Sequence, residues 1–255
     1  VLAHRGANAQ IKKSDINFEA IKGAKLLYIA PLNGNSTKVL DDIVNFAKEN
    51  NVKVCFNAGS SSLKKGFNYL KKILENAHVV VLNKEEATMA TQIQVRPDTK
   101  DEHFSEELIH PDIKEMFKKL KVKDYQIIVI TDGNNGAYAY DGKSFYFCPV
   151  FNGPVTSTLG AGDAFASTLC AALWKNGPDI GKALMYASVN SAGVVSKFGA
   201  TQGLMKFEEI EQKLKENPNY TYKKDTTKTP HVGVIAQDLQ KVFPNAVKKG
   251  ADGFL

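Results

Sequence analysis

Short apolar segments that alternate with amphipathic helical patterns constrain the fold of this chain more than any other feature. Four such segments are bounded by turn-forming residues and are predicted to be buried strands: Leu26–Ala30, Val52–Asn57, Val79–Asn83 and Ile127–Thr131. Between them, Thr37–Asn50 and Leu63–Leu74 repeat apolar residues every three or four positions, as a helix with one buried face does. This alternation favours right-handed crossovers and a mainly parallel sheet covered by helices. The predicted class is therefore α/β.

The second half of the chain adds a hairpin and three helices to this pattern. The dipeptide Asp141-Gly142 favours a two-residue hairpin turn and separates two apolar stretches, Gly136–Tyr140 and Ser144–Val150. Helical patterns then cover Ala161–Lys175, Pro178–Phe198 and Phe207–Lys215. We therefore expect the second half to begin with two paired strands and to end in helices.

A polar stretch, Gln92–Pro111, interrupts the regular pattern. It contains two prolines and is predicted to be a surface excursion. Its histidines, His103 and His110, lie seven residues apart without the helical glutamate that accompanies a zinc-protease pair. We therefore expect these histidines to be solvated rather than bound to a metal.

Charge and cysteine content exclude several classes of protein. The chain carries 33 Lys and Arg against 27 Asp and Glu, a net charge of +6, but the lysines are mixed with acids as on solvated helix faces. We therefore expect no nucleic-acid partner. Cys55, Cys148 and Cys170 fit neither a disulfide framework nor a CxxC metal site, and the apolar run Ala164–Trp174 is shorter than the ~20 residues that span a bilayer. We expect a soluble protein of the reducing cytoplasm, with no membrane partner.

A loop of small residues that leads directly into a helix carries the strongest chemical signal. Gly160 and Gly162 let backbone amides approach an anion, and the helix N-terminus directs free N–H groups and its positive dipole end to the same place. Asp163, in the first helical turn, can accept a proton from an attacking hydroxyl while the amides stabilise a transferred phosphoryl group. The alternative is an ordinary tight turn with an acidic residue at a helix start.

The stretch Gly160–Phe165 (GAGDAF) resembles the C-terminal signature of the ribokinase-like, PfkB family of carbohydrate kinases, whose pattern is DTxGAGD. Three further blocks are similar in order and spacing: Asn83–Glu86 to the NxxE motif, Thr131–Gly136 to the TxGxxG nucleotide turn, and Phe198–Thr201 to a late Gly-Ala segment. The resemblance covers about residues 1–214. It implies a three-layer α/β/α ribokinase-like fold and an ATP-dependent phosphotransferase that acts on a carbohydrate hydroxyl.

The resemblance assigns roles to individual residues of this chain. It makes Asp163 the catalytic base and forms the anion hole over the transferred phosphate from Gly160, Ala161 and Gly162. Asn190 is assigned to the nucleotide site, although an asparagine on a helix face of small residues also suits a packing contact. The nucleotide site implied by the resemblance consists of Thr131, Gly133, Gly136, Asn190 and Ala200.

ATP and Mg²⁺ are the implied ligands. Asn83 and Glu86 would order Mg²⁺ and phosphate through waters, a chemistry that requires oxygen ligands. The residues alone favour a different structure, a strand-to-helix turn in which Asn83 caps the helix and Glu86 is its third residue. Ser157 stands where the signature has its first aspartate, which removes a carboxylate from the place of the family's monovalent cation (K⁺) site.

The acceptor side of the family pattern is incomplete. Arg5–Asn8 resembles the end of the lid region, and Asn8 is the candidate substrate contact, whereas about the first third of a typical member has no counterpart. The implied acceptor is a sugar or, as in the adenosine kinase type, a nucleoside. The alternative from another class is a nucleotide-binding remnant that holds no acceptor. Family members often dimerise through the lid, so a homodimer is left open.

The composition changes after the last predicted helix. Thr229–Gln240, followed by Phe243-Pro244, resembles the intramolecular chaperone auto-processing domain of phage tail-spike proteins. We expect a kinase domain over residues 1–215 and an extension over residues 216–255, with the junction near Lys215–Asn219. The tail alone favours a phage-like assembly or chaperone module, and an ordinary C-terminal extension is the alternative.

Overall fold

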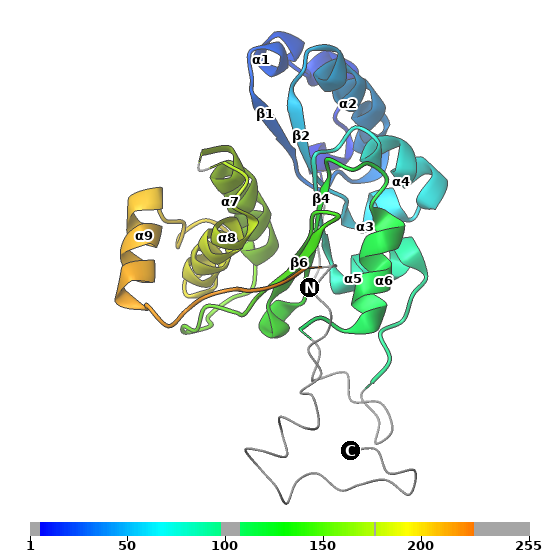
Figure 1. The fold of residues 1–255 in the computed structure, drawn as a ribbon. Helices are drawn as coiled ribbons and strands as arrows, with labels where there is room; N and C mark the ends of the chain where they lie inside the picture. The colour runs from blue at the N-terminus through cyan, green and yellow to red at the C-terminus, as the bar shows by residue number, and fades with distance from the viewer. Residues whose placement is uncertain (1–5, 98–107, 176, 227–255) are drawn as a thin grey trace, which may run out of the picture. The chain divides into compact units, whose positions relative to one another are not determined.

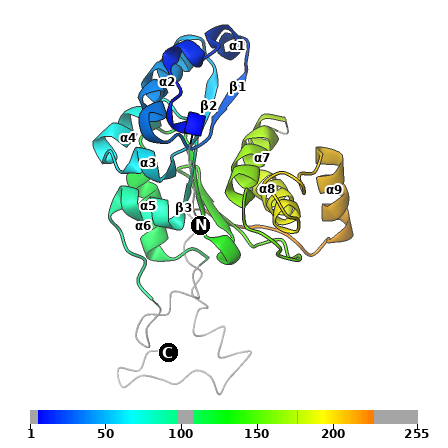
Figure 2. The same cartoon turned by 180° about the vertical axis from the view of Figure 1, so that it is seen from behind.

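A computed structural model describes residues 6–97, 108–175 and 177–226, and in this part of the chain a seven-stranded sheet separates two layers of helices (Figures 1 and 2). Strands β1 to β4 run parallel, and β5 pairs antiparallel with both β4 and β6. The predicted α/β class is confirmed. The strands lie in chain order: β1 (Leu26–Ile29), β2 (Lys53–Asn57), β3 (Val79–Asn83), β4 (Ile127–Thr131), β5 (Ala137–Tyr140), β6 (Ser144–Cys148) and β7 (Lys223–Thr226).

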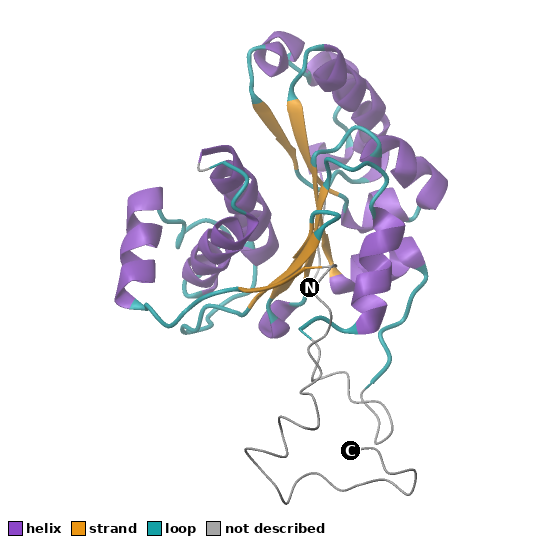
Figure 3. Cartoon of the chain, viewed as in Figure 1, coloured by secondary structure: helices purple, strands orange, loops and turns teal. Residues whose placement is uncertain are grey.

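The helices are divided between the two faces of the sheet (Figure 3). The crossovers between β1 and β4 all progress in one direction, so right-handed connections place their helices on one face. These helices are α2 (Leu40–Glu49), α3 (Gly59–Leu63), α4 (Phe67–Leu74), α5 (Lys84–Thr91) and α6 (Pro111–Leu120), with α1 (Phe18–Lys22) beside α2. The opposite face carries α7 (Ala161–Lys175) and α8 (Ile180–Val195), and α9 (Phe207–Glu216) packs on α8. Short 3-10 turns are η1 (Gly6–Ala9), η2 (Lys13–Asp15), η3 (Gly34–Val39) and η5 (Gly133–Asn135).

Two hydrophobic cores result from the alternation of side chains along each strand. In β3, Val80 and Leu82 belong to the core under α2–α6, while Val79 and Val81 belong to the core under α7 and α8. In a strand that is covered on both faces, side chains that point to either face are buried. The sequence of such a strand is therefore a continuous apolar run rather than an alternation of apolar and polar residues. No helix in the described ranges is long and apolar enough to cross a membrane.

Local backbone chemistry departs from the predicted pattern at two places. The helix predicted over Leu63–Leu74 begins only at Phe67, because Gly66 adopts φ +90°, and Leu63 is instead the last residue of the separate helix α3. The hairpin loop is also longer than two residues. The side chain of Asp141 accepts hydrogen bonds from the backbone N–H groups of Lys143 and Ser144, each at 2.7 Å, and this turn replaces the two-residue form.

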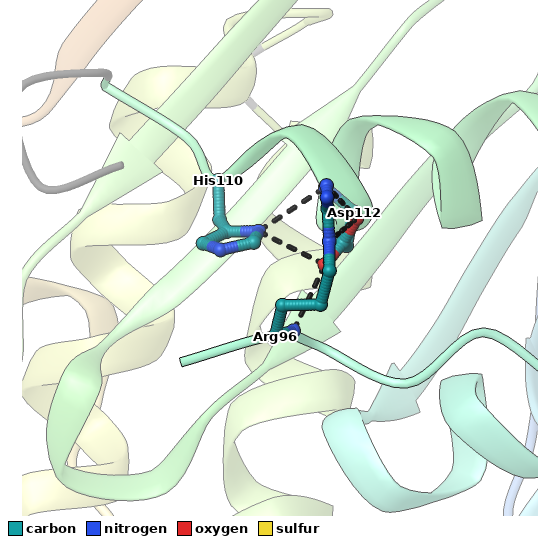
Figure 4. A network of polar contacts seen from close by, with 3 residues as sticks. All are labelled: Arg96, His110 and Asp112. Atoms are coloured by element: carbon teal, nitrogen blue, oxygen red, sulfur yellow. Dashed lines mark hydrogen bonds and ion pairs between the residues drawn. The ribbon is translucent and has the colours of Figure 1, made fainter. Parts of the chain in front are cut away.

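The excursion after α5 is tied to the start of α6 by a polar network (Figure 4). The guanidinium of Arg96 donates to both carboxylate oxygens of Asp112, at 2.8 Å from Nη2 to Oδ1 and 3.0 Å from Nε to Oδ2. His110 accepts a hydrogen bond at Nδ1 from the backbone N–H of Asp112 and caps α6. The expectation of a solvated His110 is therefore wrong, and His103 lies outside the described residues.

Two of the cysteines bring one strand and one helix into contact. The side chains of Cys55 in β2 and Cys170 in α7 are in contact, with their Cα atoms 6.4 Å apart, a pairing that the spacing of the cysteines in the sequence did not indicate. The two residues are 115 positions apart in the sequence, yet both side chains lie in the core between β2 and α7. Cys148 is a buried free thiol, and burial raises its pKa to about 11.

The chain after α9 returns to the sheet and adds β7. The hydroxyl of Tyr220 donates to the carbonyl oxygen of Pro149 at 2.7 Å, and the ring of Tyr222 packs against Gly181 in α8 so closely that a Cβ there would collide with it. Residues up to Asp225 consequently form one compact unit.

The Arg96–Asp112 pair generates a prediction for stability. Asp112 is buried and the Arg96 hydrogen bonds hold the pKa of its carboxyl below the usual range. The stabilisation is therefore present above the unfolded-state pKa and is lost as the pH falls through the lower, folded-state pKa. We expect Asp112→Asn to lower the free energy of unfolding at pH 7 by about 1–3 kcal/mol in urea titrations, with a smaller difference below about pH 4.

The exposed pair between Lys13 and Asp42, at 2.6 Å, offers a matched control. Asp42→Asn should change the free energy of unfolding by less than about 1 kcal/mol, because exposed ion pairs stabilise little. Equal effects of the two substitutions would show that burial of Asp112 does not strengthen its ion pair.

Candidate functional site

The carboxyl ends of the parallel strands lie at one edge of the sheet, and α7 begins at the same edge. Asn57 ends β2, Asn83 ends β3 and Thr131 ends β4, and Asn83 and Thr131 are paired directly in the sheet register. Open α/β sheets bind ligands at this edge. Residues from separate sequence motifs therefore come together here through the topology of the sheet.

A cavity of about 400 Å³ opens beside the start of α7. Its walls come from the turn after β4, the 150–158 loop and the facing sides of α7 and α8. Of the predicted residues, it is lined by Thr131, Gly133, Gly136, Ala161 and Gly162. Its apolar lining residues are Ala137, Val150, Phe151, Val155, Phe165, Ala192 and Val195. Its volume is typical of a small-molecule site.

The entry to α7 is fixed by contacts with distant backbone. Gly160 has φ +83°, and a Cβ at this position would collide with the backbone of Ala200. The hydroxyl of Ser191 in α8 donates to the carbonyl oxygen of Ala161 at 3.1 Å. Ala200 therefore supports the loop from behind, and it is the glycine at position 160 that permits the close approach.

The first turn of α7 presents the predicted anion-binding amides. The N–H groups of Gly162 and Asp163 belong to the first turn, where helical amides lack partners within the helix. Space is open around the Gly162 Cα, whereas the Ala161 N–H donates to the Thr158 carbonyl oxygen at 3.3 Å. The Asp163 side chain is exposed in the same turn. The Ala161 N–H thus already has a partner, and the Gly162 and Asp163 amides remain the candidates for anion binding.

Asn83 and Glu86 form a reciprocal helix cap. The Asn83 side chain accepts from the Glu86 N–H at 2.8 Å, and Glu86 Oε2 accepts from the Asn83 N–H at 3.0 Å, so the capping structure expected from the residues alone is confirmed. Burial raises the pKa of the Glu86 carboxyl. Beside this cap, Lys84 lies 2.6 Å from the carboxylate of Asp132 and connects the NxxE segment with the turn after β4.

Seven predicted site residues do not line the cavity: Asn8, Asn83, Glu86, Gly160, Asp163, Asn190 and Ala200. Asn190 is buried, and its amide donates to Thr168 Oγ1 at 2.7 Å and accepts from the Met205 N–H at 2.8 Å, a helix-packing contact. Ala200 lies behind Gly160 rather than in the cavity wall. Asn8 has an exposed side chain, and its carbonyl oxygen accepts from Ser36 Oγ at 2.7 Å. Arg5, its neighbour in the lid-like segment, is outside the described residues.

Residues that the motifs did not indicate complete the cavity. One face of α8 supplies Ser188, Ser191, Ala192 and Val195, which follow the i, i+3, i+4, i+7 spacing of a helical stripe. That spacing is the signal by which the sequence could have identified them. The loop residues Phe151, Asn152 and Gly153 carry no comparable pattern. In the described residues, no group of three or more His, Cys, Asp or Glu side chains could hold a metal ion.

Comparison with known proteins gives two family matches. Residues 1–206 match the pfkB family of carbohydrate kinases, and residues 205–248 match the chaperone of endosialidase family. The predicted resemblance of the tail is thereby confirmed, although residues 227–248 of that match lie outside the described residues. The domain junction expected near Lys215–Asn219 stays a prediction.

Curated relatives are sugar kinases. A 5-dehydro-2-deoxygluconokinase of Bacillus subtilis (strain 168) is 26% identical over 215 residues, which are 81% of this chain and 61% of that protein. A ribokinase of Lactococcus lactis subsp. lactis (strain IL1403) is 32% identical over 119 residues, 46% of this chain and 38% of that protein. The chain thus spans less than two thirds of the length of these relatives.

Solved structures reproduce the fold. A ribokinase from Thermotoga maritima gives a TM-score of 0.58 at 21% identity, covering 83% of this chain and 64% of its own. An Escherichia coli protein described as ribokinase II, in complex with ATP and Mg²⁺, gives 0.61 at 18% identity, covering 80% and 62%. These neighbours confirm the three-layer ribokinase-like architecture. Since the kinase match extends over most of the residues, the chain belongs to the pfkB family of carbohydrate kinases.

Proposed function

We propose that the protein is an ATP-dependent phosphotransferase that moves the γ-phosphate of ATP to a hydroxyl of a carbohydrate. The observation that carries the proposal is the cavity that joins the start of α7, with Asp163 in its first turn, to an apolar wall. The names of the relatives suggest 5-dehydro-2-deoxygluconate and D-ribose as the first acceptors to test. A nucleoside acceptor is the alternative within the same reaction class.

The two sides of the cavity suit the two parts of a nucleotide. The glycine turn after β4 and the first-turn amides of α7 suit phosphate, because N–H groups and the helix dipole favour negative charge. The apolar part of the lining, with Phe151 and Val195, suits an aromatic base. An E. coli neighbour of the same fold is solved with ATP and Mg²⁺, which supports this assignment.

The proposed reaction is an in-line transfer. The acceptor hydroxyl loses its proton to the carboxylate of Asp163, its oxygen forms a bond to the γ-phosphorus, and the bond to the β-phosphate oxygen breaks to release ADP. The Gly162 and Asp163 amides face the equatorial oxygens, on which charge accumulates. Asp163 then returns the proton to solvent.

Mg²⁺ would neutralise charge on the phosphates when bound. Asn83 Oδ1 and Glu86 Oε2 already accept hydrogen bonds within the cap. Because the cap offers Mg²⁺ only one carboxylate, that of Glu86, we expect it to contact the ion through water molecules rather than directly. The chain's own contribution is to hold this carboxylate beside the strand ends and to fix it through the Asn83 N–H.

Asp163→Asn tests the role of the base. The side chain is exposed, so we expect unchanged stability and an unchanged thermal shift with Mg-ATP, while ADP release with an acceptor falls by about 10²–10⁴-fold. Saturating Mg-ATP at about 100 times its Kd should raise the unfolding midpoint by several degrees in both proteins, since stabilisation of about 2.7 kcal/mol is expected. Glu115→Gln, at an exposed position of α6, is the control. Comparable turnover in Asp163→Asn would exclude Asp163 as the base.

Gly162→Ala tests the anion hole without disturbing the fold. A Cβ at Gly162 has open space and improves helix propensity by about 1 kcal/mol, but it occupies space that a phosphate needs. We expect retained stability and a Kd for Mg-ATP at least about tenfold higher, measured by calorimetry. Gly160→Ala, in contrast, should destabilise the protein, because of its positive φ and the Ala200 backbone. Wild-type ATP affinity in Gly162→Ala would argue against phosphate at this turn.

Glu86→Gln separates the cap from the metal role. Glutamine still accepts from the Asn83 N–H, so the free energy of unfolding should change by less than about 0.5 kcal/mol. The lost charge should raise the Mg²⁺ concentration for half-maximal ADP release by about tenfold or more. The neighbouring exposed Glu85→Gln provides the control, and an equal effect there would indicate only general electrostatics.

A further inference from the structure

Tyr28 places a phenol beside the start of α7 on the side away from the nucleotide cavity. It lies on β1 with its side chain in the layer under α7, in register with Cys55 of β2, and Asn57 follows two residues later on the same face of β2. The hydroxyl of Tyr28 is close enough to Asn57 and Asp163 for both groups to act on its pKa. The three polar groups therefore surround one point at the sheet edge.

The Tyr28 hydroxyl is buried beside the side chains of Asn57 and Asp163, but neither is placed at the distance and angle of a full hydrogen bond to it. A buried hydroxyl without a partner is unfavourable, and phenylalanine would fill the same space without that cost. Burial raises the pKa of Tyr28 to about 12, the nearby Asn57 opposes this rise and the Asp163 charge adds to it. The phenol is therefore a neutral hydrogen-bond donor at physiological pH, adjacent to the proposed base.

The cavity and Tyr28 lie on different strands of the sheet, and this placement indicates what the Tyr28 hydroxyl could bind. All residues that line the nucleotide cavity follow Ile130 in the chain, from Thr131 to Val195, so the cavity uses β4, β5, the 150–158 loop, α7 and α8. Tyr28 and Asn57 lie on β1 and β2, across the first turn of α7. In-line transfer requires the donor phosphate and the acceptor oxygen on opposite sides of the transferred group. The β1–β2 side is therefore the acceptor side.

We propose that Tyr28 is an acceptor-contact residue, whose hydroxyl donates a hydrogen bond to an oxygen adjacent to the one that Asp163 deprotonates. The acceptor class that satisfies both groups is a polyol with neighbouring oxygens, as in a sugar or sugar acid, because a simple alcohol would leave the phenol unpaired. By holding the neighbouring oxygen, Tyr28 positions the attacking oxygen indirectly, and it accepts no proton during the reaction. This inference rests on the proposed kinase function and extends it to the recognition of the acceptor.

Tyr28→Phe removes the O–H group alone and tests the inference by steady-state kinetics. ADP release is measured with D-ribose, its monodeoxy derivatives and 5-dehydro-2-deoxygluconate as acceptors. We expect KM for the acceptor to rise by about three- to tenfold, the effect of one lost hydrogen bond, with an unchanged Mg-ATP thermal shift and an unchanged or higher unfolding midpoint. One monodeoxy derivative should lose the same factor with the wild-type protein and lose nothing further with Tyr28→Phe.

Tyr69→Phe is the matched control. The Tyr69 hydroxyl donates to the Thr37 carbonyl oxygen at 2.9 Å in the other core, so this substitution should lower the unfolding midpoint and leave KM unchanged. The same KM and the same deoxy profile in Tyr28→Phe as in the wild type would overturn the inference while the kinase function stands. Mg-ATP binding without ADP release for any acceptor would overturn the kinase function, and the acceptor contact with it.

Discussion

The parallel pairing of β1 to β4 is the constraint on which the rest of the structure depends. These strands follow one another in space in their chain order, so right-handed crossovers keep α2 to α6 on one face and leave the other face to α7 and α8. Their carboxyl ends then share one edge, where Asn57, Asn83 and Thr131 close neighbouring strands. Each strand end contributes one group, and the site is assembled by the sheet rather than by any single loop.

The start of α7 is held in place mainly by backbone packing. The Ala200 backbone lies against Gly160, and Ser191 binds the Ala161 carbonyl oxygen. Amides held in this way are oriented before any ligand arrives, which is the condition under which fixed dipoles stabilise developing charge most effectively. The late Gly-Ala segment thereby supports the proposed phosphate-binding turn from behind, although it was expected to line the nucleotide site.

The features that could be predicted from the sequence are strands buried on both faces and contacts between residues close together in the chain. The parallel strands were recognisable because both faces are apolar, and α7 has the predicted bounds because its glycine loop and its helical pattern coincide. The Asn83–Glu86 cap was readable because its two hydrogen bonds join residues three positions apart. The break at Gly66 was missed, since the apolar spacing continues across it.

Features that depend on tertiary contacts were beyond the sequence. The Cys55–Cys170 contact joins residues 115 positions apart, and no local pattern brings them together. Asn190 was expected in the nucleotide site, yet its side-chain amide forms hydrogen bonds with Thr168 and Met205. The neighbouring positions Ser188 and Ser191 of α8 line the cavity instead. A helical stripe of small residues does not reveal which of its members face a ligand and which face another helix.

Because the chain returns to the sheet after α9, the end of the kinase family match and the end of the compact structural unit lie at different residues. The match to the kinase family model ends at residue 206, whereas the compact unit continues to Asp225 and includes Ile210, Tyr220 and Tyr222. Residues that resemble a chaperone family therefore complete the hydrogen bonding of the last sheet edge and cover Gly181 of α8. The boundary between the two family matches therefore falls inside one hydrophobic core, and a cut at that boundary would expose side chains of α8 that the following segment buries.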